Sequence, residues 1–160
     1  MQIRPVTDDD VPSLVDELWL PFADEMTDVD QYDALAEDVD VRADAVAYRQ
    51  DQLADEDVQT FVAVDGDGDA CLVGYTTIVY SESPPIFARG PVAKVKDLYV
   101  APDARGEGLG TELLERAHEW GRERGCERAA LSVHARNEAA QSCYESIGYE
   151  TRYVKMDRPL

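Results

Sequence analysis

The sequence predicts an α/β fold in which a mixed sheet carries helices on both faces. Strand-like alternation and helical spacing follow one another in the order β-α-α-β-β-β-α-β-α-β, and a turn sequence joins two strands as a hairpin. The chain has 160 residues, of which 44% are hydrophobic. That size and content suit one core in a single domain over residues 1–160.

The N-terminal third predicts one strand followed by helices. Residues 2–6 alternate weakly, as a first strand does. Thr7 and the three aspartates after it form an N-cap signal, with acids at the positive end of a helix. Apolar side chains recur at helical spacing over 11–19, and Pro21 is expected to end or bend this helix. The acidic stretch 24–57 predicts one or two amphipathic helices.

A hairpin follows, with strands at 59–64 and 71–80 and a turn at 65–69. Asp-Gly steps in the turn supply the positive φ that hairpins need. A calcium loop counted from the first of these aspartates would need Gly at its sixth position and Glu at its twelfth. Those positions hold Ala70 and Thr76, so we predict no metal site.

The C-terminal half alternates strands with helices. Residues 93–100 form a strong strand pattern, and 108–124 a long helix that a glycine ends. A strand at 129–134 and a helix at 137–147 come next. The alternation over 149–156 predicts a last strand.

The charge balance excludes several partners. Asp and Glu number 34 against 15 Lys and Arg, for a net charge of −19. This field repels nucleic acid and anionic membranes. No apolar run is long enough to span a bilayer, and the N-terminus lacks a signal-peptide pattern, so we expect a cytoplasmic protein. Acids occur in nearly every segment, which favours a halophilic surface over a docking patch for one cationic partner.

The three cysteines, Cys71, Cys126 and Cys143, lie far apart without a CxxC pair. We expect them to be small buried apolar side chains rather than a disulfide or metal framework.

Residues 105–111 form a glycine-rich loop between a strand and a helix. Glycines let the backbone approach a ligand, and the unpaired N–H groups of a helix start attract anions such as a pyrophosphate. The dinucleotide fingerprint would need glycine where Thr111 stands, and the G-K-[ST] of a P-loop is absent. The pattern is instead R-x-x-G-x-G.

With Arg105, Gly108 and Gly110 at these positions, the sequence resembles the GNAT superfamily of acetyl-coenzyme A-dependent N-acetyltransferases. The preceding segment 95–102 is similar to that family's fourth strand. Residues 137–149 resemble its second coenzyme-binding block, N-x-x-A-x-x-x-Y-x-x-x-G-[FY]. The close resemblance covers roughly residues 92–150.

The resemblance implies a mostly antiparallel, twisted sheet and direct transfer of acetyl from acetyl-coenzyme A to a primary amine, without a metal. It implies that Tyr144 protonates the departing thiolate and that Asn137 bonds the pantetheine arm. Main-chain groups of Leu98 and Val100 would meet the pantetheine and the thioester carbonyl. The amides expected at the pyrophosphate are those around Gly106, Gly108, Gly110 and Thr111.

The resemblance does not identify the general base. Asp97 is the candidate, because it is a strand acid near the presumed thioester; Glu82 and water-mediated deprotonation remain open. Cys143 beside the catalytic tyrosine could suggest an acyl-cysteine route, but no histidine is close in sequence. We expect His118 to be solvated and His134 to lie near the cleft.

The acceptor is expected to be a small-molecule or peptide amine, bound by residues 19–57 and the loop 81–90. A homodimer is left open. Two alternatives remain: a non-catalytic acyl-coenzyme A-binding module and a transferase of a longer acyl group. Aromatic residues that could line the acceptor cleft are Trp19, Phe22, Tyr32, Tyr80 and Phe87.

Overall fold

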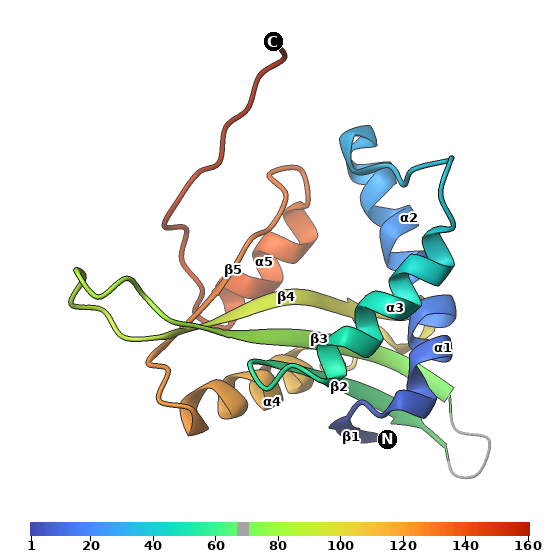
Figure 1. Ribbon diagram of the computed structural model, residues 1–160, viewed down its shortest axis with the longest axis horizontal. Helices are drawn as coiled ribbons and strands as arrows, with labels where there is room; N and C mark the ends of the chain where they lie inside the picture. The colour runs from blue at the N-terminus through green and yellow to red at the C-terminus, as the bar shows by residue number, and fades with distance from the viewer. Residues whose placement is uncertain (67–70) are drawn as a thin grey trace.

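The computed structural model describes residues 1–66 and 71–160, and its centre is a five-stranded sheet (Figure 1). The strand order is β1-β2-β3-β4-β5. The first four strands are antiparallel neighbours, and β5 runs parallel to β4, which confirms the mixed, mostly antiparallel sheet. The strands are β1 (Gln2–Pro5), β2 (Val58–Asp65), β3 (Cys71–Ser81), β4 (Val92–Val100) and β5 (Arg128–Leu131).

Helices cover both faces of this sheet. On one face, α4 lies across β2, β3 and β4; the helices of the N-terminal third contact β2, β3 and β4 on the other. The predicted hairpin forms, although most of its turn at 65–69 lies outside the described residues. The helices are α1 (Val11–Ser13), a π-helical segment (Leu14–Trp19), α2 (Leu20–Val29), α3 (Val41–Leu53), α4 (Leu109–Glu123) and α5 (Glu138–Ser146).

Of the two expected effects of Pro21, an end or a bend, the structure excludes the end, because the helical run continues to Val29. A proline in a regular helix removes one hydrogen bond and clashes with the carbonyl four residues earlier. Here the proline follows the wider π-helical segment, in which the Leu20 amide donates to the Val15 carbonyl five residues back. The π-helical turn thus comes directly before the residue that a regular helix would not accommodate.

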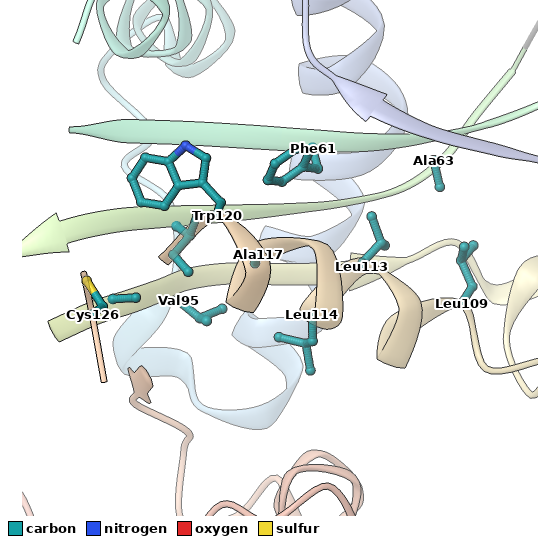
Figure 2. Packing of buried hydrophobic residues seen from close by; sticks show 11 residues of the cluster. Phe61, Ala63, Val95, Leu109, Leu113, Leu114, Ala117, Trp120 and Cys126 are labelled. Carbon is teal, nitrogen blue, oxygen red and sulfur yellow. The ribbon is translucent and has the colours of Figure 1, made fainter. Parts of the chain in front are cut away.

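Two hydrophobic clusters fill the two faces. Between the sheet and α4, Leu113, Leu114 and Ala117 are fully buried, and Trp120 closes one end of the row (Figure 2). The other cluster packs the π-helical segment against Tyr75 and neighbouring strand residues. The amphipathic pattern of α4 therefore places its apolar stripe on the sheet, as its spacing predicted.

The predicted last strand is wrong for the single chain: residues 149–160 form neither helix nor strand. Only Tyr149 is partly buried there, and its hydroxyl lies 2.6 Å from Nε2 of His118 on α4. That contact also corrects the expectation that His118 is solvated. Figure 1 shows the rest of the segment leading away from the body of the molecule.

The cysteine prediction holds for one residue. Cys126 is buried in the α4 cluster, whereas Cys71 and Cys143 are exposed. All three are free thiols.

Candidate active site

A bulge in β4 shapes the site. Thr77 of β3 lies opposite Asp97, and the next residue of β3 lies opposite Val95, so Lys96 is the extra residue. Side chains alternate faces along a strand, and an extra residue reverses the alternation. Val95 therefore faces α4, while Asp97 and Tyr99 face the N-terminal helices. Because of the bulge, the side chain of Asp97 lies on the face covered by the N-terminal helices, whereas a regular strand would place it on the α4 face.

Beyond the bulge, one edge of β4 is unpaired. β5 pairs with β4 only from Val92 to Val95 in the described part of the chain. The two parallel strands then diverge, so the segment from Lys96 to Val100 has β3 on one side and no strand on the other. Main-chain groups on such an edge can pair with an extended ligand. Leu98 and Val100, the predicted pantetheine contacts, lie on this segment.

The glycine loop follows directly at the end of β4. Gly106 and Gly108 have φ of 85° and 84°, a conformation that L side chains rarely adopt, and no described atom would meet a Cβ there within 4 Å. Gly108 is the N-cap of α4, and the first amide bonded within the helix is that of Glu112. The amides of the first turn, including those of Gly110 and Thr111, therefore lack intrahelical acceptors. The loop has the form of an anion site beside the free edge of β4.

Arg105 connects this loop to its neighbours, although its side chain is 46% exposed. Its Nε donates to the Val100 carbonyl at 2.7 Å, and its guanidinium lies over the ring of Tyr99. Both oxygens of Glu25 on α2 accept hydrogen bonds from Nη2 at 2.8 and 3.0 Å. The arginine thus joins the end of β4, the loop and α2. Sequence reasoning missed Glu25, one of many acids in its segment.

Asp97 is bound by a buried arginine. Nη2 of Arg49 on α3 donates to its carboxylate at 3.0 Å, and the arginine side chain is 4% exposed while that of Asp97 is 23% exposed. The guanidinium also donates hydrogen bonds to Gln52, Thr77 and the hydroxyl of Tyr75. Nothing in the sequence separated Arg49 from the other arginines, because its partners are distant along the chain.

Tyr144 lies on α5 and is half-buried, with its ring edge-on to Tyr149 at 5.8 Å between centroids. Burial raises the pKa of its phenol, with smaller contributions from the neighbouring Cys143 and from the carboxylate of Asp97. A raised pKa keeps the phenol protonated at neutral pH, the form that a proton donor needs.

Asn137 caps α5, since its side-chain oxygen accepts a hydrogen bond from the Ala140 amide at 3.2 Å. Its amide NH2 group is not needed for that bond and is a candidate donor to a ligand. Nearby, Nδ1 of His134 accepts from the Arg136 amide, so Nε2 carries the proton in the neutral ring and donates to Asp30 at 2.8 Å. This bond joins the β5–α5 loop to the end of α2.

The candidate acceptor aromatics are dispersed. Phe22 stacks on Tyr99 at 5.4 Å, and Trp19 packs against the same cluster. Tyr32 is 85% exposed at the end of the α2 segment. Phe87 contacts Arg89 in the loop before β4. Tyr80 lines an open hollow with residues 53–59, so the structure does not gather the five into one cleft.

The fold and site define the class of protein. The acetyltransferase (GNAT) family matches residues 13–149, and the chain belongs to that family. Streptothricin acetyltransferase of Streptomyces lavendulae is 37% identical over 95 residues, which are 59% of this chain and 46% of the relative. Thialysine N-epsilon-acetyltransferase of Bos taurus is 31% identical over 78 residues, 49% of this chain and 44% of the relative. The chain spans about half the length of these curated relatives.

A solved structure has the same fold over the whole length of this chain. A mutant form of a Bacillus halodurans protein superposes with a TM-score of 0.86 at 22% identity, covering 100% of both chains. At a sequence identity this low, the superposition shows a similar fold and no more. Among the residues that the structure describes, no three His, Cys, Asp or Glu side chains are grouped to hold a metal ion. None of the helices in those same ranges is both long and apolar enough to cross a membrane.

Proposed function

We propose that this chain transfers acetyl from acetyl-coenzyme A to a primary amine by direct attack in a ternary complex. The observation that carries the proposal is a set of three features: the anion site at the start of α4, the free edge of β4 that precedes it, and the protonated phenol of Tyr144. A coenzyme with a pyrophosphate, an extended pantetheine arm and a thioester needs each of them in that order.

The proposed chemistry assigns a role to each group. Amides around Gly106, Gly108 and Gly110 hold the pyrophosphate, and Asn137 donates to the pantetheine arm. A main-chain N–H on the free edge of β4 stabilises the oxyanion that forms when the amine attacks. Tyr144 gives its proton to the departing thiolate.

Asp97 is the proposed base that takes the proton from the ammonium. Its ion pair with Arg49 holds the carboxylate in one position, which supports this role. The same ion pair also connects α3 to β4. The anionic protein favours cationic acceptors in its field, and the two relatives above are named for streptothricin and for the N-epsilon of thialysine. A small-molecule amine is therefore the acceptor class we propose, in a high-salt environment that suits the surface charge.

The test is coenzyme A release from acetyl-coenzyme A and longer acyl donors over a panel of amines, in buffer of high KCl content. We expect Tyr144→Phe to lower kcat about 100-fold with little change in KM for acetyl-coenzyme A, because only proton donation is lost. Tyr153→Phe, at an exposed tyrosine near the C-terminus, is the matched control and should leave kcat unchanged.

Three other outcomes of these assays would change the proposal. Unchanged turnover in Tyr144→Phe would remove the phenol from the mechanism. Binding of acetyl-coenzyme A without transfer to any amine would favour a non-catalytic binding module. Faster turnover with a longer acyl donor would replace acetyl in the proposal.

A further inference from the structure

The helix that carries the proposed proton donor, α5, has few contacts that fix its position. None of its residues is fully buried, although Tyr144 packs against the α4 cluster. Its side-chain hydrogen bonds stay within the helix or reach only the loop directly before it. In the described part of the chain, a single side-chain hydrogen bond joins residues 137–149 to any other element, and it links Tyr149 to His118 on α4. The position of the phenol therefore depends on this one bond more than on any other polar contact.

The chain after α5 folds back onto Tyr144. Gly148 ends the helix with a φ of 100°, in the left-handed conformation that glycine adopts readily. The Tyr149 amide donates to the Tyr144 carbonyl at 3.0 Å, and the Gly148 amide donates to the Glu145 carbonyl at 3.1 Å. These two bonds form a Schellman motif, in which the residue after the glycine contacts the helix residue five positions earlier. The rings of Tyr149 and Tyr144 accordingly meet edge-on.

His118 holds the far end of the Tyr149 side chain. Its Nε2 lies 2.6 Å from the Tyr149 hydroxyl oxygen. Burial lowers the pKa of His118, so the ring is neutral at neutral pH and one ring nitrogen can accept a hydrogen bond. Nδ1 lies 3.6 Å from a carboxylate oxygen of Glu115, which favours the proton on Nδ1 and leaves Nε2 as the acceptor. Burial raises the pKa of Tyr149 to about 12, so its hydroxyl keeps the proton that it donates.

The helix that carries His118 is well packed on the sheet. Leu113, Leu114 and Ala117 of α4 are fully buried there, and the same helix begins at the anion site of the glycine loop. A side chain on a packed helix holds its position more precisely than one on a loop. A single helix thus supports the anion site at its start and, through His118 and Tyr149, the ring of Tyr144.

We propose that His118 and Tyr149 are positioning residues that set where the phenol of Tyr144 meets the departing thiolate. The inference rests on the proposed function, in which Tyr144 donates that proton. Neither residue takes part in the proton transfer. Without the hydrogen bond, Tyr149 can turn away and Tyr144 loses the neighbour that limits its rotamers. A misplacement of about 1 Å can lower turnover as much as about 100-fold.

The experiment measures kcat and the KM for acetyl-coenzyme A by coenzyme A release, with the amine of the panel above that reacts fastest. We expect His118→Phe and Tyr149→Phe each to lower kcat about 10-fold and to leave the KM nearly unchanged, because the phenol is misplaced while the coenzyme site is intact. The double variant should lose no more than either single variant, since both remove the same bond. His118→Gln, whose amide can still bond the hydroxyl, should keep most of the activity.

A second cycle separates positioning from a general structural effect. In a Tyr144→Phe background, His118→Phe should lower kcat no further, because the group that it positions is already absent. Glu119→Gln, at an exposed position next to His118 on α4, is the control and should leave kcat unchanged in both backgrounds. All variants are compared at a temperature at which circular dichroism shows them to be folded.

The outcomes distinguish the inference from the function on which it rests. Equal fold losses from His118→Phe in the two backgrounds, or full activity of His118→Phe with Tyr144 present, overturn the positioning role alone. Full activity of Tyr144→Phe by itself removes the phenol from the proposed function and the positioning role with it. Absence of release with every amine refutes the transfer, and the inference then fails together with the proposed function.

Discussion

At the scale of single residues, Arg49 and Asp97 show how the site depends on partners that are distant in sequence. The arginine is almost completely buried, and the acid is its only charged contact in the described residues. A buried guanidinium without a counter-charge is costly. The pair therefore fixes α3 against β4 whether or not the acid also takes a proton from the acceptor.

Replacing this acid separates its two roles. We expect Asp97→Asn to lower the free energy of unfolding by about 1–3 kcal/mol, because Arg49 loses a charged acceptor, and to lower kcat about 100-fold as the base is lost. Urea unfolding and the pH dependence of kcat/KM measure the two effects.

Arg49→Met is the companion variant, since it weakens the packing of α3 but keeps the carboxylate. We expect it to retain the acidic limb of the pH–rate profile, which Asp97→Asn should lose. If both variants lose turnover to the same degree with unaltered pH profiles, the acid is a positioning residue and not the base.

Residue-level prediction from the sequence succeeded where a motif fixes the backbone. The glycine-rich pattern is matched by the positive φ values of Gly106 and Gly108, whereas the roles of Tyr144 and Asp97 stay predictions. Glu25 and Arg49 could not be predicted, because their pairing depends on how the N-terminal helices pack against the sheet.

At the scale of elements, α4 approaches β4 closely at one glycine. A Cβ built on Gly121 would lie 2.7 Å from the Cβ of Ala93, a distance that real side chains essentially never show. Helix spacing predicted α4 at 108–124, against Leu109–Glu123 in the structure. It did not show that this glycine allows the helix to lie so close to the sheet.

Gly121→Ala should therefore destabilise the protein although alanine favours helices. The added methyl group must push the helix from the strand, and overpacking of a core typically costs about 1–3 kcal/mol. Thermal unfolding followed by circular dichroism measures the loss. Gly90→Ala is the control, because no described atom lies within 4 Å of its Cβ and its φ is not positive; stabilisation by Gly121→Ala would contradict the close approach.

Periodicity left two features of the elements undetermined, each for its own physical reason. The helix through Pro21 survives because the preceding π-helical turn changes the hydrogen-bond partners, and periodicity does not report such a turn. The strand pattern of 149–156 records a preference for pairing, but the pattern does not say which molecule supplies the partner.

At the scale of the whole molecule, the net charge of −19 sets how the protein responds to salt. Like charges spread over the surface repel one another, and the folded chain holds them closer together than the unfolded chain does. Salt screens this repulsion over a Debye length of about 10 Å at 0.1 M and about 3 Å at 1 M.

We expect the Tm to rise by about 5 °C or more between 0.1 and 2 M KCl, equivalent to about 2 kcal/mol for a chain of this size. Differential scanning calorimetry measures the change. Sucrose at matched osmolality is the control for preferential exclusion, which stabilises without screening. No gain with KCl beyond that with sucrose would contradict adaptation of the surface to salt.

The extra residue in β4 has a consequence for insertions and deletions. Before Lys96 the odd-numbered side chains belong to the α4 core, and after it they belong to the core of the N-terminal helices. Removing this one residue would make Val95 and Asp97 direct neighbours, which regular alternation places on opposite faces, so the side chains that follow would keep their faces. The strand can therefore lose the bulge residue without changing which core each side chain enters, whereas a second extra residue at the same place would exchange the faces of the side chains that follow.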